Sequence, residues 1–216
     1  MHTALIDYGS GNLRSAAKAA VRAAADSSLA NRITVTSDPK VVRAADRIIL
    51  PGQGAFADCR HGVQAVPGLE EALIEVVQKK QRPFFGICVG MQLMATKGLE
   101  HGSHKGFNWV KGEVAALTPK DPSCKVPHMG WNALQLSATA QQHPIFKGIS
   151  SGAHAYFAHS YVFIGAPKTT ILATTDHGGE IIAAIGCDNM VGTQFHPEKS
   201  QAIGIRLLSN FLSWSP

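Results

Sequence analysis

Short apolar runs and helical periodicities alternate along the first half of the chain. One apolar face with the spacing i, i+3, i+4, i+7 and i+8 is formed by Leu69, Ala72, Leu73, Val76 and Val77, which predicts a helix. Residues 12–25 are rich in Ala, Lys and Arg and also favour a helix. Strands are predicted at residues 3–8, 33–36, 47–50 and 83–87. Strands that alternate with helices indicate βαβ units around a parallel sheet.

The second half lacks long helical patterns, and its strands follow one another closely. They are predicted at residues 113–117, 156–163, 171–175, 181–185 and 191–195, with turn-forming Gly and Pro between several of them. A closing helix is predicted over residues 204–213. The expected fold is therefore α/β, with a mostly parallel central sheet flanked by helices and a mixed or antiparallel section in the second half. No linker or repeat divides residues 1–216, so we expect a single domain.

The composition excludes several classes of protein. Hydrophobic residues make up 45% of the 216 residues and charged residues 16%, which is typical of a globular protein. No apolar run approaches the ~18 residues of a membrane span, and the first residues include Asp7 where a secretory signal would be apolar, so we expect neither a secreted nor a membrane-spanning protein. The net charge of +5 comes from scattered Lys and Arg, so we expect no nucleic-acid binding.

The cysteines and glycines argue against several kinds of bound group. The four cysteines, Cys59, Cys88, Cys124 and Cys187, are far apart, so neither a zinc site nor a disulfide framework is expected. Reduced thiols favour a cytoplasmic location. The glycine-rich start of the helix over 12–25 has Arg14 where a dinucleotide-binding motif needs its third glycine. We therefore expect no cofactor and no metal.

Cys88 lies in a nucleophile-elbow pattern, in which an apolar strand is followed by Gly-x-Cys-x-Gly and an apolar helix start. The tight turn needs small residues on both sides of the nucleophile, and Gly86 and Gly90 supply them. The amide of Val89 would point toward an oxyanion, and the helix N-terminus would stabilise a thiolate. A buried structural cysteine is the alternative interpretation of this segment.

A general base for such a thiol is offered by His196. Pro197 favours an extended conformation at His196, in which residues two apart project to the same side. Glu198 would then lie beside the imidazole and fix its tautomer. Read alone, the same residues are also compatible with a surface turn.

A third segment, Pro51-Gly52-Gln53-Gly54, follows the predicted strand at 47–50. Ligands of open α/β sheets bind at the carboxyl ends of the strands. The backbone at Gln53 and Gly54 is therefore a candidate second oxyanion donor, with a plain turn as the alternative. The glycines leave the orientation of the Gln53 peptide open.

Together these motifs resemble the class I (triad) glutamine amidotransferases, and within them the glutaminase subunits of imidazole glycerol phosphate synthase. The class resemblance is carried by residues 86–92 and 196–198, and the narrower one by residues 7–13, 51–56, 127–132 and 156–161. These blocks span nearly the whole chain. The family often has valine where this chain has Gln53.

The resemblance implies a function and a set of site residues. Glutamine would be hydrolysed by Cys88, His196 and Glu198, and the ammonia passed to a (β/α)8-barrel cyclase in histidine biosynthesis. The oxyanion would be held by Val89, Gln53 and Gly54, glutamine by Gly52, Gln92, His159, Ser160 and Tyr161, and the cyclase by Asn12, Trp131 and Lys199. Two alternatives stay open: another triad glutaminase or a γ-glutamyl hydrolase, and a catalytically silent interaction module.

Overall fold

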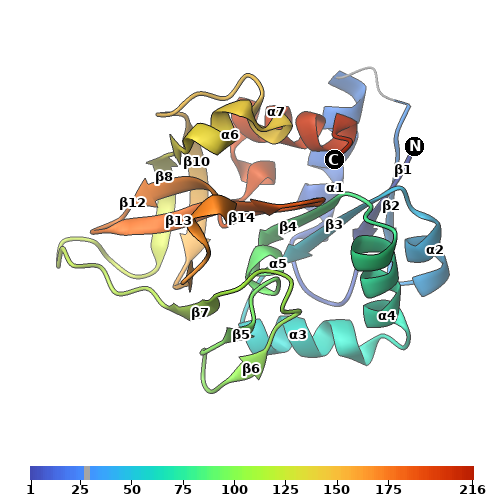
Figure 1. Ribbon diagram of the computed structural model, residues 1–216, viewed down its shortest axis with the longest axis horizontal. Helices are drawn as coiled ribbons and strands as arrows, with labels where there is room; N and C mark the ends of the chain where they lie inside the picture. Colours follow the sequence, from blue (N-terminus) through green and yellow to red (C-terminus); the bar gives the residue numbers. More distant parts are fainter. Residues whose placement is uncertain (27–29) are drawn as a thin grey trace.

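An eight-stranded sheet forms the centre of the computed structural model, which describes residues 1–26 and 30–216 (Figure 1). Its strand order is β2-β1-β3-β4-β14-β13-β12-β9. The strands are β1 (His2–Ile6), β2 (Arg32–Thr36), β3 (Arg47–Gly52), β4 (Phe84–Cys88), β9 (Gln135–Leu136), β12 (Ile171–Asp176), β13 (Glu180–Cys187) and β14 (Met190–Thr193).

The sheet confirms the predicted division of the chain. From β2 to β14 all neighbouring strands are parallel, whereas β14, β13, β12 and β9 pair antiparallel. In the middle of the parallel part, Ile48, Ile49 and Leu50 of β3 are completely buried. A strand covered on both faces has no polar alternation, which is why residues 47–50 are apolar without interruption.

Helices cover both faces of this sheet. Helix α1 (Leu13–Asp26) packs against α7 (Gln201–Ser213) on one face, and α2 (Pro39–Ala44), α3 (Phe56–Ala65) and α4 (Leu69–Ile74) lie on the other (Figure 1). The buried face of α1 consists of alanines, which allows α7 to approach closely. The part of the chain that the structure describes also contains two short α-helices, α5 (Val89–Gln92) and α6 (Ala138–Gln142).

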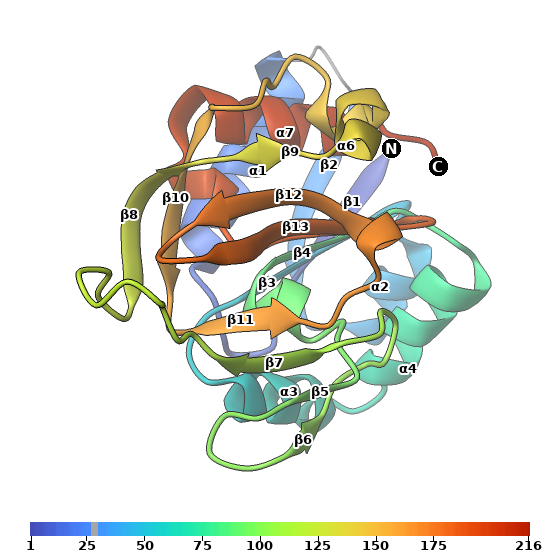
Figure 2. The same ribbon diagram turned by 60° about the vertical axis from the view of Figure 1, so that its left-hand side comes forward.

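Two smaller sheets stand beside the antiparallel part of the large one (Figure 2). One pairs β10 (His154–His159) with β8 (His128–Ala133). The other has the order β11-β7-β5-β6, from β11 (Tyr161–Ile164), β7 (Glu113–Ala116), β5 (Lys97–Gly98) and β6 (His104–Lys105).

The single strand predicted at residues 156–163 is wrong. The strand is interrupted at Ser160, so that β10 and β11 are separate strands in different small sheets. Apolar residues lie on both sides of the break, because both halves are partly buried. Which sheet each half joins depends on pairing with β8 and β7, far away in the sequence.

One further prediction needs correction, and one helix was missed. The helix pattern at 69–77 is α-helical only to Ile74 and continues as a π-helix, Glu75–Lys79. The hydrophobic spacing cannot separate the two helical forms, because Val76 and Val77 of the π-helix are buried like Leu69, Ala72 and Leu73 of α4. Helix α3 was not predicted, since its buried face includes Cys59 and Arg60 and its chain includes Gly62.

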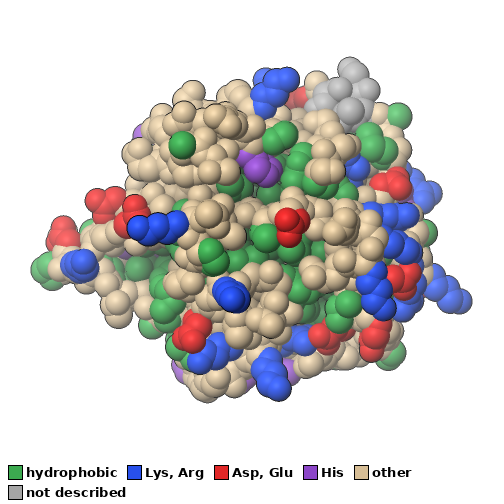
Figure 3. Space-filling view, in the orientation of Figure 1, with side chains coloured by type: hydrophobic (Ala, Val, Ile, Leu, Met, Phe, Trp, Pro, Cys, Tyr) green, Lys and Arg blue, Asp and Glu red, His purple; other side chains and the backbone are tan. Residues whose placement is uncertain are grey.

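Charged side chains mix on the surface over α2 and α4. On the face seen in Figure 3, Lys and Arg gather at the right-hand edge with acidic groups between them. Glu75 there forms ion pairs with Arg43 and Lys80. Across residues 1–26 and 30–216, no helix has the length and apolar character needed to cross a membrane.

Candidate active site

Three neighbouring parallel strands end at the same edge of the large sheet and bring the predicted residues together. In the register of β3 and β4, Gly52 lies opposite Cys88, and in that of β14 and β4, Thr193 lies opposite Ile87. Residues that follow these strands must therefore meet. This is the edge at which open α/β sheets bind ligands.

Cys88 has the strained backbone of a nucleophile elbow, with φ 55° and ψ −110°. A non-glycine residue with positive φ is uncommon and marks a position that its surroundings enforce. A Cβ atom at Gly86 would overlap the carbonyl of Gly90, and one at Gly90 would overlap the carbonyl oxygen of Leu50. The two glycines are therefore required for the close approach of β4, α5 and β3, as the sequence predicts.

The helix that follows Cys88 is shorter than expected. Helix α5 contains only Val89–Gln92, after which the chain continues through Leu93 without further helix. A single turn has few aligned peptide dipoles, so the local amide of Val89 matters more here than a helix macrodipole.

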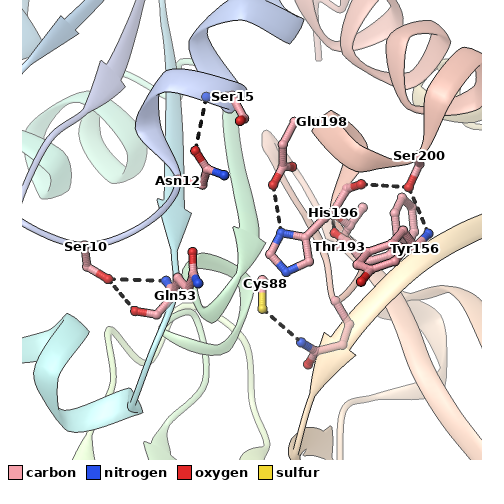
Figure 4. A network of polar contacts seen from close by, with 12 residues as sticks. Ser10, Asn12, Ser15, Gln53, Cys88, Tyr156, Thr193, His196, Glu198 and Ser200 are labelled. Carbon is pink, nitrogen blue, oxygen red and sulfur yellow. Dashed lines mark hydrogen bonds and ion pairs between the residues drawn. The ribbon is translucent and has the colours of Figure 1, made fainter. Parts of the chain in front are cut away.

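His196 and Glu198 form a buried pair beside Cys88 (Figure 4). His196 Nδ1 lies 2.8 Å from Glu198 Oε1, and both side chains are almost completely buried. Burial alone would lower the pKa of His196, but hydrogen bonds with Cys88 and Glu198 outweigh it and raise that pKa to about 9. The imidazolium form of His196 is thus favoured when the sulfur of Cys88 is anionic.

The local geometry of this pair differs in one respect from the prediction. His196 is extended, with φ −97° and ψ 100°, but residues Pro197–Lys199 form a turn of 3₁₀ helix and not an extended strand. Proline at the first position of a helix favours such a turn. Ser200 holds the turn in place, because its hydroxyl donates to the carbonyl of His196 at 2.7 Å.

A cavity of about 310 Å³ opens beside these residues. Most predicted site residues line it: Gln53, Gly54, Cys88, Val89, Gln92, His159, Ser160, Tyr161, His196 and Lys199. Of the other predicted residues, Glu198 reaches the cavity only through His196, and Asn12 and Trp131 lie outside its lining. Gly52 is also outside it; a Cβ there would press on Gly90 and Val89.

The Gln53 backbone is held by Ser10. The N–H of Gln53 donates to Ser10 Oγ at 3.3 Å, and the same hydroxyl donates to the Gln53 carbonyl at 2.5 Å. The thiol of Cys59 donates to that carbonyl as well, at 3.4 Å. In Figure 4, Gln53 lies between Ser10 and Cys88. The N–H of Gln53 therefore points to Ser10 in this structure.

A chain of neutral histidines borders the cavity. His159 Nδ1 donates to the carbonyl of Tyr161 at 3.0 Å, which leaves its Nε2 to accept from His128 Nδ1 at 3.1 Å. His128 Nε2 then accepts from the amide of Asn132. Burial, and next the charge of His177, lowers the pKa of His128 to about 4; burial, and next His128, lowers that of His159 to about 3.

Two of the predicted interface residues meet on one tyrosine. The ring of Trp131 lies edge-on to Tyr156, with centroids 6.0 Å apart, and Lys199 Nζ lies 5.5 Å from the Tyr156 ring centroid. Trp131 is 46% exposed. Asn12 is exposed at the start of α1, where its side chain accepts from the N–H of Ser15.

Two polar residues of the site were missed in the sequence. Glu100 lines the cavity and accepts from the N–H of Phe56 at 2.7 Å; no motif marks it. Gln194 is completely buried and donates to Cys88 Sγ at 3.6 Å. Gln194 lies inside the strand predicted at 191–195 and directly follows β14 in the structure; a long polar side chain at such a buried position is unusual, and this signal could have identified it.

Comparisons with known proteins point to one family. The family model "Glutamine amidotransferase class-I" matches residues 4–213. The imidazole glycerol phosphate synthase subunit HisH of Rhodospirillum rubrum is 56% identical over 216 residues, and that of Agrobacterium fabrum is 53% identical over 219 residues. Both alignments cover 100% of this chain and 100% of the relative.

Solved structures support the fold. A structure described as a glutamine amidotransferase superposes with a TM-score of 0.70 at 16% identity and covers 97% of this chain and 96% of its own. The glutaminase domain of Trypanosoma brucei CTPS, solved with bound acivicin, gives a TM-score of 0.64 at 17% identity, with 99% and 92% covered. The match to the family model over residues 4–213 and the full-length HisH relatives show that the chain belongs to the class I glutamine amidotransferases.

Proposed function

We propose that this protein is the glutaminase subunit of an imidazole glycerol phosphate synthase in histidine biosynthesis. It hydrolyses glutamine to glutamate and ammonia. The observation that carries the proposal is the placement of Cys88 and the His196–Glu198 pair beside one cavity. The full-length HisH relatives indicate which synthase the subunit serves.

The nucleophile is Cys88. Its sulfur attacks the side-chain carboxamide carbon of glutamine, and the C–N bond breaks to give a thioester and ammonia. His196 holds the thiol proton as an imidazolium, which its raised pKa favours, and passes that proton to the departing nitrogen. Water, activated by His196, then hydrolyses the thioester to glutamate and restores the thiol. Glu198 orients and stabilises the imidazolium from Nδ1.

The oxyanion is held by backbone N–H groups. The N–H of Val89 adjoins Cys88, and the segment of Gln53 and Gly54 lines the same cavity. Such donors stabilise charge that develops in the transition state. In this structure the Gln53 N–H is bound to Ser10, so it must turn before it can donate to an oxyanion in the cavity. We propose that it makes this turn in the active state.

Glutamine is held by Gly52, Gln92, His159, Ser160 and Tyr161. All but Gly52 line the cavity, and Gly52 lets β3 approach the elbow. The volume of about 310 Å³ lies in the usual range for small-molecule sites. Glu100 lines the same cavity and supplies a negative charge for the α-ammonium group of an amino-acid substrate.

The ammonia passes to a (β/α)8-barrel cyclase, which contacts Asn12, Trp131 and Lys199. The exposed Trp131 ring supports an interface, since aromatic residues are enriched at such surfaces. We further propose that residues 1–216 form one glutamine amidotransferase domain, supported by a core that runs from Ala4 to Trp214. A cytoplasmic location is supported by the four free thiols.

Ammonia release from glutamine tests the function. The purified chain is assayed with and without a candidate cyclase, and Cys88→Ala serves as the negative control. Release that depends on Cys88 and rises with the cyclase is the expected result. Release of free glutamate from γ-glutamyl peptides, without ammonia release from glutamine, would assign the chain to γ-glutamyl hydrolysis.

A further inference from the structure

Gln194 is a completely buried amide next to the nucleophile. It follows β14 directly and precedes Phe195 and His196. Its Nε2 donates to Cys88 Sγ at 3.6 Å, and its Oε1 accepts from Gln92 Nε2 at 3.0 Å. It is not part of the cavity lining, so it faces the sulfur from the protein side.

The orientation of this amide follows from its neighbours. The Tyr161 carbonyl can only accept, so the group that Gln92 presents to it at 3.1 Å is its NH₂. The same NH₂ then needs an acceptor in Gln194, which turns Gln194 Oε1 to Gln92 and Nε2 to Cys88. If the Gln194 amide were flipped, its NH₂ would face the NH₂ of Gln92. The hydrogen bonds from the Tyr161 carbonyl through Gln92 to Gln194 therefore fix the N–H of Gln194 at the sulfur of Cys88.

Packing alone does not explain an amide in this place. Burial of an amide is costly unless its hydrogen bonds are made, and an apolar side chain of similar length would fill the same volume. A thiol is a weak acceptor, whereas a hydrogen bond to a charged group is stronger than one between neutral groups. The amide therefore gains most when the sulfur is anionic.

We propose that Gln194 is a positioning residue for Cys88: its Nε2 fixes the sulfur and stabilises the thiolate from the side opposite the substrate. This inference rests on the proposed function and adds a residue to its nucleophile. The proposal gives different roles to the neighbouring side-chain amides of Gln92 and Gln194. Gln92 lines the cavity, whereas Gln194 acts only through Cys88.

The test is the alkylation of Cys88 by iodoacetamide across a pH series, followed for each cysteine by mass spectrometry. Gln194→Met keeps the length of the side chain and removes the donor. We expect Cys88 in this variant to react about tenfold more slowly at neutral pH, with the midpoint of its pH profile shifted upward. Half-buried Cys124 is the internal reference, and Gln141→Met, on the exposed face of α6, is the matched control; neither should change.

A second variant keeps the test valid if Gln194→Met does not fold. Gln194→Glu preserves the acceptor for Gln92 but places a carboxylate at the sulfur, so it should slow alkylation more strongly than Gln194→Met. Melting temperatures confirm that the compared proteins are folded. A Cys88 pH profile identical to wild type in a folded variant would overturn the proposal.

Steady-state kinetics give an independent readout. Loss of a group that acts only on the nucleophile should lower kcat and leave KM near the wild-type value, whereas Gln92→Met should raise KM. If the wild type released no ammonia even with the candidate cyclase present, but the alkylation profile still shifted in Gln194→Met, the proposed function would fail and the role of Gln194 would stand.

Discussion

Ser10 binds both backbone polar groups of Gln53, accepting from its N–H at 3.3 Å and donating to its carbonyl at 2.5 Å. One hydroxyl thus holds the segment that we propose as part of the oxyanion site, and it directs the N–H away from the cavity. The neighbouring Gly54 has a φ of 95°, a conformation that glycine adopts without strain. The segment can therefore turn once the hydroxyl releases it.

Removal of this hydroxyl should release the segment. We expect Ser10→Ala to raise the glutaminase rate of the isolated chain by about two- to tenfold, the value of one neutral hydrogen bond. Ammonia release without any partner is the measurement. Ser103→Ala, in an exposed loop, is the control. A rate in Ser10→Ala that is equal to or below wild type would show that Ser10 does not restrain Gln53.

Replacement of the nucleophile should abolish activity and spare the fold. Cys88→Ala keeps both flanking glycines and removes only the sulfur, so we expect no measurable ammonia release and an unchanged circular dichroism spectrum. Cys124→Ala and Cys187→Ala change half-buried thiols outside the cavity and should retain most activity. Substantial activity in Cys88→Ala would rule out this nucleophile.

The two partners of the buried pair should differ in importance. His196→Asn removes the group that transfers protons, whereas Glu198→Gln leaves an oxygen that can still accept from His196 Nδ1. We therefore expect the loss of kcat to be larger for His196→Asn than for Glu198→Gln. The reverse order, measured at neutral pH on folded proteins, would contradict the assignment of the base.

The buried histidines should make the protein sensitive to acid. In the folded state the pKa of His128 is about 4 and that of His159 about 3, both below the usual value near 6.5. The unfolded chain therefore binds more protons below pH 6.5, so the stabilising contribution is complete above that pH and is lost as the pH falls toward 4.

Urea unfolding between pH 5 and 7.5 checks this expectation. His128→Gln removes one of the two groups, so the slope of the unfolding free energy between pH 5 and 6 should decrease by roughly 1.4 kcal/mol per pH unit. His101→Gln, at an exposed position, should leave that slope unchanged. An unaltered slope in His128→Gln would mean that His128 takes up its proton in the folded state too.

Local patterns predict the parts of the site that a continuous segment specifies. The elbow could be predicted because the steric need for Gly86 and Gly90 is local, and the same holds for the extended backbone of His196 before Pro197. The parallel order of strands follows from their alternation with helices. These features predicted where Cys88 and His196 would meet.

Contacts between segments that are distant in the chain could not be predicted from the sequence. Ser10 lies 43 residues from Gln53 in the chain, and Gln194 lies 106 residues from Cys88. No pattern along the chain encodes such a pair, because a hydrogen bond across the sheet edge depends on strand register. The break at Ser160 was hidden for the same reason: pairing with β7 and β8 decides it.

The exposed ring of Trp131 should be important for binding the partner. It rests on Tyr156, which Lys199 also contacts, so the three side chains form one preformed surface. We expect Trp131→Ala to weaken association with a candidate cyclase at least tenfold, since aromatic anchors commonly dominate such interfaces. Isothermal titration calorimetry measures the affinity, and circular dichroism confirms the fold. Val21→Ala removes another exposed apolar side chain, 55% exposed on α1, and should bind as wild type does. Equal affinity for the Trp131→Ala and Val21→Ala variants would place the cyclase on a different face of the molecule, while the proposed roles of Cys88 and His196 would be unaffected.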